Sequence, residues 1–224
     1  QTGVGCSGDC DATASVTVAG GTPGYTYDWS GSPVGDSTSA VTGLCPGVYT
    51  VQVQDAVPCG VIQTFIIAPP VPITVDVTTQ DASCAGACDG AAEAVATGGT
   101  GVYAYAWWPG GQTTADVTGL CAMDHLLTVS DSSGCDTTIT VSIAEPLPID
   151  PVATVSNVGC SGACDGSIVL APVGGSGNYT YAWSNGSSGN QVQGLCAGTV
   201  TVTVSDGACD TTLVFDITEP DPLN

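Results

Sequence analysis

The sequence of 224 residues contains no lysine and no arginine, against 21 aspartate and glutamate residues and a single histidine. At a formal charge of −21, the chain has no cationic side chains that could meet the phosphates of a nucleic acid or the head groups of an anionic membrane. We therefore expect no nucleic-acid partner. Isopeptide cross-links, which need lysine, are excluded for the same reason.

Long apolar runs and helix-forming residues are also scarce. No stretch is apolar over the length that a membrane-spanning helix needs, so we expect no membrane insertion. Glycine, proline, threonine, serine and valine dominate, and valine and threonine alternate along many segments. This pattern predicts an all-β fold. The chain begins at Gln1 and not at methionine, so we interpret it as a mature segment or a part of a longer protein.

One order of features occurs three times, in Cys6–Cys59, Cys84–Cys135 and Cys160–Cys209. Each copy has two cysteines four residues apart, a Gly-Gly turn, a Tyr-x-Tyr-x-Trp strand, a Gly-Leu-Cys turn and an alternating strand. Self-similarity at a fixed period indicates an array. We predict three domains, which are repeat 1 (1–70), repeat 2 (71–147) and repeat 3 (148–224).

The segments between the repeats are short and rich in proline, as in Ala68–Pro72 and Glu145–Pro148. Because proline fixes the backbone angle φ, such linkers predict a semi-rigid rod. Repeat 1 has only residues 1–5 ahead of its first cysteine, so its first strand is expected to be short or missing.

The aromatic residues of each Tyr-x-Tyr-x-Trp strand share one face, because side chains alternate along a strand. We interpret the three tryptophans, Trp29, Trp107 and Trp183, as the core of a β-sandwich of the immunoglobulin or fibronectin type III kind. The alternative is a platform for sugars. Trp108 is out of phase with Trp107 and should be exposed, so it distinguishes the two hypotheses.

The twelve cysteines divide as four per repeat at nearly constant spacing, which predicts disulfides and an oxidising compartment. Zinc ligands usually come as two short pairs, and this pattern does not provide them. Sequence alone leaves three pairings open within a repeat. We favour first with fourth and second with third. Six strands that alternate up and down bring the turns of the first and fourth cysteines to one end, whereas the second and third meet only if an extra short strand intervenes. A first-to-fourth bond would stabilise a repeat by roughly 4 kcal/mol on the chain-entropy model. The predicted bonds are Cys6–Cys59, Cys10–Cys45, Cys84–Cys135, Cys88–Cys121, Cys160–Cys209 and Cys164–Cys196.

Carboxylates recur at fixed places beside these cysteines. If the first and fourth cysteines are bonded, the neighbouring aspartates approach one another, and calcium binds loop carboxylates. The sequence therefore predicts a weak calcium site at the disulfide end, whereas the alternative is that these residues cap turns. No other cofactor is expected. The candidate ligands are Asp89, Asp131, Asp136, Asp165, Asp206 and Asp210.

Hydroxyl groups and the one histidine give two further candidates. The Asp-Ser/Thr-x motifs at Ser37, Thr137 and Thr211 are candidate O-glycosylation sites. His125 stands where repeat 1 has Tyr49, and we interpret it as a structural replacement. No nucleophile, base and cationic stabiliser recur together, so we predict no enzyme activity.

The strings CSGACDG, GGSGNYTYAWSNG and GLCAGTVTVTVSDGAC, together with the TEP that follows, resemble the SprB repeat. That family occurs in tandem in very large surface adhesins of gliding bacteria. The resemblance implies type IX secretion, display outside the cell and no catalysis. The string GLCPGVYTV is also similar to a fibronectin type III corner in which a tyrosine hydroxyl bonds back to the turn. Tyr49 fits that corner, whereas His125 and Val200 do not, so we do not expect the bond in every repeat.

Two functions are consistent with these observations. The first is an extracellular structural segment of a surface adhesin or filament involved in gliding motility, acting as a stiff spacer. The alternative is an adhesive module that binds polysaccharide, with or without calcium. Association of chains end to end or laterally is compatible with either function.

Overall fold

The computed structural model describes residues 1–31 and 37–223. Within these ranges the chain forms β-strands joined by turns and loops. The described part of the chain contains no helix long and apolar enough to cross a membrane.

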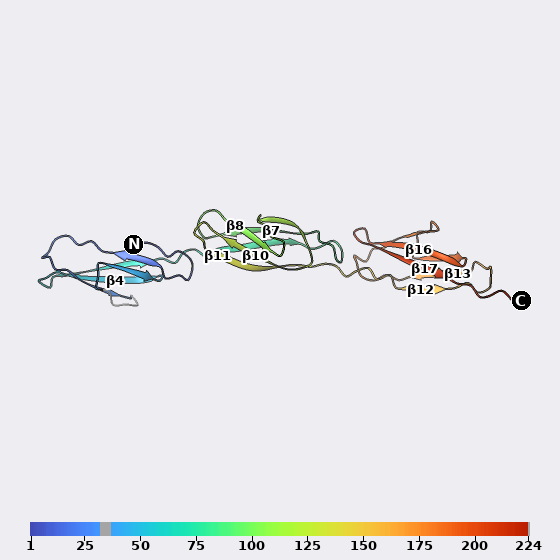
Figure 1. Cartoon of the computed structure of the whole chain (residues 1–224), viewed down its shortest axis with the longest axis horizontal. Helices are drawn as coiled ribbons and strands as arrows, with labels where there is room; N and C mark the ends of the chain where they lie inside the picture. Colours follow the sequence, from blue (N-terminus) through green and yellow to red (C-terminus); the bar gives the residue numbers. More distant parts are fainter. Residues whose placement is uncertain (32–36, 224) are drawn as a thin grey trace. The chain divides into compact units, whose positions relative to one another are not determined.

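Each repeat builds two antiparallel sheets, and this confirms the prediction of tandem immunoglobulin-like β-sandwich repeats (Figure 1). The strands of repeat 1 are β1 (Ala12–Ser15), β2 (Thr26–Ser30), β3 (Ala40–Leu44), β4 (Gly47–Gln54) and β5 (Gly60–Ile67). Repeat 2 has β6 (Thr74–Gln80), β7 (Gly90–Thr97), β8 (Ala104–Trp108), β9 (Asp116–Leu120), β10 (Met123–Ser130) and β11 (Asp136–Ile143). Repeat 3 has β12 (Ala153–Ser156), β13 (Gly166–Leu170), β14 (Thr180–Trp183), β15 (Gln191–Leu195), β16 (Gly198–Ser205) and β17 (Asp210–Ile217). The sheets are β1-β3 and β2-β4-β5, then β6-β7-β9 and β8-β10-β11, then β12-β13-β15 and β14-β16-β17.

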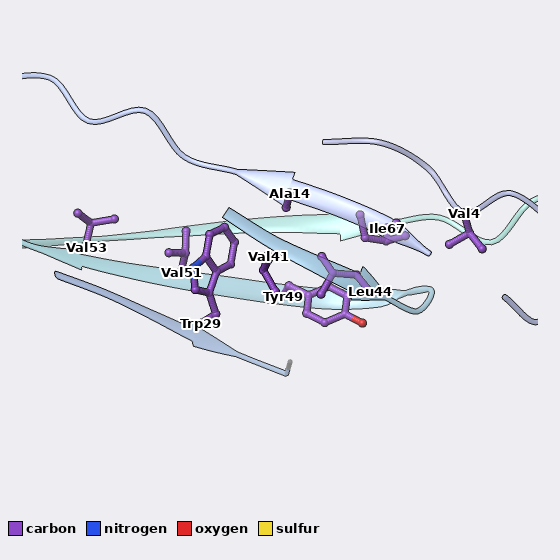
Figure 2. Packing of buried hydrophobic residues seen from close by; sticks show 10 residues of the cluster. Val4, Ala14, Trp29, Val41, Leu44, Tyr49, Val51, Val53 and Ile67 are labelled. Carbon is purple, nitrogen blue, oxygen red and sulfur yellow. The ribbon is translucent and has the colours of Figure 1, made fainter. Parts of the chain in front are cut away.

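The core of repeat 1 lies between its two sheets, and Figure 2 shows its side chains gathered there. Trp29 on β2 is buried and packs edge-on against Phe65, with 6.0 Å between the ring centroids. Tyr49 stacks on the same phenyl ring at 5.7 Å. Alternating residues of β4 point inward, as the period-two pattern predicts.

Equivalent residues are buried in the other repeats. In repeat 3 the cluster contains Trp183, Ile168 and Val202, and in repeat 2 Trp107 is only 2% exposed. Each tryptophan also donates its indole N–H to a backbone carbonyl, for example Trp107 to Thr114 at 3.0 Å. The tryptophans are therefore core residues, as predicted.

The chain changes sheet without reversing direction between β14 and β15. β14 runs antiparallel to β16, and β16 follows β15 after only Cys196 and Ala197, so β14 and β15 run the same way. β15 pairs with β13 in the other sheet. A repeat therefore makes one reversal fewer than strict alternation would give. The first three cysteines of a repeat lie at one end, which we call the trailing end. The fourth cysteine and the Gly-Gly turn lie at the other, the leading end.

The expected tyrosine corner is present in repeat 1, where the Tyr49 hydroxyl donates to the carbonyl of Cys45 at 2.9 Å. The expectation that His125 breaks the pattern was wrong. Its Nε2 lies 3.0 Å from the equivalent carbonyl of Cys121 and the ring is 3% exposed, so the imidazole replaces the phenol. Only Val200 of repeat 3 lacks a donor.

The first strand of repeat 1 is missing from the described residues, as expected, and its first sheet has two strands where the other repeats have three. Residues near the start partly occupy the place beside β1, because the Thr2 N–H donates to the carbonyl of Thr13 at 2.9 Å.

The chain divides into two compact units, each of which joins a terminal repeat to part of repeat 2. The first comprises residues 1–77, 94–115 and 126–140, and the second 78–93, 116–125 and 141–224. The junction between repeats 1 and 2 therefore lies inside the first unit, and the junction between repeats 2 and 3 inside the second.

Replacing Tyr49 with phenylalanine should destabilise repeat 1, because the carbonyl of Cys45 loses its partner at a cost of about 1 kcal/mol. Hydrogen exchange followed by mass spectrometry should show β4 amides exchanging about fivefold faster if they open globally. Tyr27→Phe is the control, since the described residues give that hydroxyl no hydrogen bond. Equal protection in the two variants would contradict the corner's role.

Candidate functional site: disulfide junctions between repeats

Three disulfides join the second and third cysteines of a repeat, as predicted. The reason is visible in repeat 3, where β13 and β15 are paired with Gly166 opposite Leu195. The cysteines just outside those positions are therefore neighbours. The bonds are Cys10–Cys45, Cys88–Cys121 and Cys164–Cys196, each with a Cα–Cα distance of 3.9 Å.

The predicted bonds between the first and fourth cysteines of one repeat were wrong. The first cysteine instead pairs with the fourth cysteine of the next repeat. Cys6 bonds to Cys135 at a Cα–Cα distance of 5.4 Å, and Cys84 bonds to Cys209 at 5.5 Å. Cys59 of repeat 1 and Cys160 of repeat 3 are free and exposed. The predicted pairs Cys6–Cys59, Cys84–Cys135 and Cys160–Cys209 are therefore all absent.

The length of the last strand explains why the first and fourth cysteines of one repeat do not bond to each other. Cys209 immediately precedes the eight residues of β17, whereas the loop of Cys160 is tied to the far end of that strand. Val158 donates to the carbonyl of Thr218 at 3.0 Å, and Gly162 donates to the Glu219 carboxylate at 2.7 Å. Eight extended residues span about 26 Å, and a disulfide needs Cα atoms within about 7 Å. The two cysteines of one repeat are therefore too far apart to bond.

An aspartate holds each fourth cysteine in place. In repeat 2, Asp131 Oδ1 accepts from the N–H groups of Ser133 and Cys135 at 2.9 and 3.1 Å, and Oδ2 accepts from Thr100 at 2.8 Å. The carboxylate thus ties the cysteine loop to the Gly-Gly turn. Asp55 and Asp206 make the equivalent bonds, with Cys59 N–H at 2.9 Å and Cys209 N–H at 2.8 Å.

These hydrogen bonds favour the charged carboxylate. The N–H of Thr100 is the main cause that lowers the pKa of Asp131, with Cys135 and Ser133 adding to it and burial opposing it. The pKa values of Asp55 and Asp206 are lowered in the same way, chiefly by the N–H groups of Thr22 and Cys209 respectively.

A second aspartate organises each first cysteine. Asp11, Asp89 and Asp165 each accept from the N–H of the residue before that cysteine at 2.9 Å. The cysteine then begins a tight turn, in which the Cys84 carbonyl accepts from Ala87 and the Cys160 carbonyl from Ala163, both at 3.0 Å. The loop of free Cys160 thus has the same local structure as that of bonded Cys84.

The proline linker lies against the Gly-Gly turn of the repeat it enters. Gly99 donates to the Val71 carbonyl at 3.0 Å. Gly98, at φ +79°, leaves no room for a side chain, because a Cβ there would lie 2.0 Å from the Pro72 oxygen. Tyr103 supports this turn by donating its hydroxyl to the Gly98 carbonyl at 2.5 Å. Gly174 and Pro148 repeat the arrangement, with a 2.1 Å clash.

The predicted calcium ligands do not form a site. Asp89, Asp131, Asp165 and Asp206 accept hydrogen bonds from the loops just described, which is the turn-capping alternative. Asp136 and Asp210 begin β11 and β17 and line the clefts at the two junctions. Within residues 1–31 and 37–223, no three histidine, cysteine, aspartate or glutamate side chains are grouped to hold a metal ion. The geometry therefore gives the calcium hypothesis no support.

The other candidate residues are also placed. Ser37 is exposed, although Asp36 of its motif lies outside the described residues. Thr137 and Thr211 are half-buried and line the junction clefts. O-glycosylation stays a prediction, and of the three candidate residues only Ser37 is exposed. Trp108 is 66% exposed, as expected, but it has no equivalent in the other repeats.

Sequence reasoning missed the pairing between neighbours and the glycines that receive the linker. One signal was available, because the first cysteines are 78 and 76 residues apart and so keep one register along the array. In an array with such a register, bonding to the next repeat is as regular as bonding within a repeat.

Peptide mapping without reduction checks the pairing. We expect the cross-linked peptides Cys6–Cys135 and Cys84–Cys209, with neither Cys59 nor Cys160 bonded to any of these four cysteines. Recovery of Cys6–Cys59 would contradict the junctions.

Replacing Asp131 with asparagine removes one of two acceptor oxygens, so the melting temperature at pH 7 should fall by about 5 °C. A carboxyl whose pKa is lowered by folding stabilises the fold above its ordinary pKa of about 3.9, and this effect is lost as pH falls through the folded value. The difference from the parent should therefore shrink below pH 4. Melting curves from pH 7 to pH 2 test this, with exposed Asp28→Asn as control. A gap that stays constant at low pH would refute the charge's role.

Chains of immunoglobulin domains are among the similar solved structures. Eight N-terminal domains of Down Syndrome Cell Adhesion Molecule align with 9% identity and a TM-score of 0.40, over 88% of this chain and 33% of that one. Titin domains I67–I69 align with 11% identity and a TM-score of 0.39, over 95% of this chain and 94% of that one. Domains 4–9 of the surface layer protein SbsC align with 14% identity and a TM-score of 0.24, over 91% of this chain and 40% of that one. At these TM-scores the likenesses say nothing about function, and the chain spans about a third of the first of them.

The comparison with curated proteins found no match. The SprB repeat model matches residues 1–34, 76–112 and 152–188, which is the first part of each of the three copies. Tandem SprB repeats with multiple disulfides are typical of extracellular surface proteins. The chain belongs to the SprB repeat family and carries three copies of the repeat.

Proposed function

We propose that this chain is a spacer of an extracellular surface adhesin, which transmits tension along its repeats and performs no reaction. The single observation that carries the proposal is the second covalent connection at each junction. Neighbouring repeats are joined by the proline linker and also by a disulfide. Membership of the SprB family supports the surface location.

The two connections give repeat 2 two covalent paths. One path comes in through the linker, runs along β6 and leaves through Cys84, which is bonded to Cys209 of repeat 3. The other comes in through Cys135, runs along β11 and leaves through the next linker. Each path is a single strand with a covalent bond at both ends.

A third covalent path runs from Cys135 back along β10 to Cys121 and through Cys88 to Cys84. Residues 89–120 lie outside all three paths. They carry β7 to β9 and the buried Trp107, so this part of the core of repeat 2 is bypassed when the junctions are pulled apart. Unfolding that part adds no length to any of the paths. A spacer built in this way keeps its length under load, whereas an adhesive module would have no use for bypassed cores.

Carbohydrate binding has less support. A platform repeated in every unit would need exposed aromatic side chains, but the three equivalent tryptophans are buried. Trp108 is exposed beside Leu126 on β10, and it stands alone among the repeats. Polysaccharide binding therefore stays an untested prediction.

Single-molecule force spectroscopy tests the proposal, with the chain held by its two termini. The shortest covalent path of the oxidised chain runs through residues 1–6, 121–135, 84–88 and 209–224, which Cys6–Cys135, Cys88–Cys121 and Cys84–Cys209 connect. At about 3.5 Å per residue, the oxidised chain should extend to about 150 Å, against about 780 Å after reduction.

The matched variant is Cys6→Ser, Cys84→Ser, Cys135→Ser and Cys209→Ser combined, which keeps the three disulfides within repeats. It should extend further than the parent and show separate unfolding events. Equal lengths for parent and variant would refute the two-path arrangement.

A further inference from the structure

Each of the two junctions is made from two surfaces, and one further surface of each kind, on repeat 1 and on repeat 3, is uncovered. The trailing surface comprises the first-cysteine loop and the proline linker. The leading surface comprises the fourth-cysteine loop and the Gly-Gly turn. At the first junction, Gly5, Cys6 and residues 70–73 line one cleft together with Gly99, Thr100 and residues 134–137.

Repeat 1 carries an uncovered leading surface. Asp55 holds the N–H of Cys59 at 2.9 Å, as Asp131 holds that of Cys135. Tyr25 donates to the Gly20 carbonyl at 2.8 Å, as Tyr103 does to Gly98. A Cβ at Gly20 would meet no atom within 4 Å, whereas at Gly98 it would meet the linker. The surface is formed and its cysteine is exposed.

Repeat 3 carries an uncovered trailing surface. Asp165 and Glu219 hold the loop of Cys160, with bonds to Gly159 at 2.9 Å and Gly162 at 2.7 Å. The tail Pro220–Leu223 has the pattern of the linkers Pro70–Ile73 and Pro146–Ile149. In those linkers the last residue is half-buried at the next Gly-Gly turn, whereas Leu223 is fully exposed.

We propose that these two surfaces join copies of this chain head to tail, with Cys160 of one copy bonded to Cys59 of the next. The occupant of each surface is thus a second copy, in the same contact that Cys6–Cys135 and Cys84–Cys209 make within the chain. The Pro222 carbonyl and Leu223 of one copy lie at Gly20 and Gly21 of the next. This inference does not depend on the spacer function, because it concerns only the leading surface of repeat 1 and the trailing surface of repeat 3.

The bond forms by oxidation of two thiols. Each thiol loses one proton and one electron, and the two electrons pass to a disulfide oxidant such as oxidised glutathione, which is cleaved to two thiols. One sulfur–sulfur bond is made and one is broken. Repetition of the step gives a covalent filament of the repeat.

The test removes Cys59 or Cys160 and follows the formation of disulfide-linked oligomers in a glutathione redox buffer on non-reducing gels. The parent chain should form a ladder of oligomers. Cys59→Ser alone and Cys160→Ser alone should each remain monomeric. Their equimolar mixture should form one dimer, and its cross-linked peptide should contain Cys59 and Cys160.

A matched control moves the thiol by two residues within the same exposed loop, as Val57→Cys in the Cys59→Ser, Cys160→Ser background. Its coupling to the copy that retains Cys160 should be at least about tenfold slower, because the surfaces place only position 59 within bonding distance.

Four outcomes would overturn the proposal. These are dimers in either single variant alone, a parent monomer closed by its own Cys59–Cys160 bond, thiols that persist in the oxidising buffer, and equal coupling of the Val57→Cys control. None of them alters the length measured by pulling one chain, so the two proposals fail separately.

Discussion

The double connection between repeats depends on where the chain crosses from one sheet of a sandwich to the other. Because β14 and β15 run the same way in different sheets, a repeat has its first three cysteines at one end and its fourth at the other. Two of the trailing cysteines are close enough to bond to each other. The first and fourth are separated by the length of β17, so each can bond only outside its own repeat. The cross-linking of the array is therefore a consequence of strand direction.

Hydrogen bonds to carboxylates prepare both sides of each junction. Asp131 orients the fourth-cysteine loop and Asp89 the first-cysteine loop of repeat 2, through backbone N–H groups in each case. The abundance of aspartate thus has a structural use, since a charged oxygen is the strongest acceptor for a turn's free N–H groups.

Much of the fold could be predicted from the sequence, because the signals were local. Alternation of valine and threonine, glycine pairs at turns and the inward phase of Trp29, Trp107 and Trp183 all correspond to the structure. The bond between each first cysteine and the fourth cysteine of the next repeat could not be predicted. It depends on a change of sheet, such as that between β14 and β15, which no residue type marks. His125 shows the same limit, since its bond to Cys121 depends on reach and burial and not on likeness to tyrosine.

The proline linker seated on the Gly-Gly turn has a consequence for how such arrays change over generations. Both junctions use a proline carbonyl, a glycine without a side chain, an aspartate and two cysteines, so these residues are common to the two pairs of neighbours. Unequal recombination between copies would insert or delete a whole repeat and still leave matching surfaces at every seam. The gene can therefore lengthen or shorten its product by one repeat at a time without new contacts having to evolve.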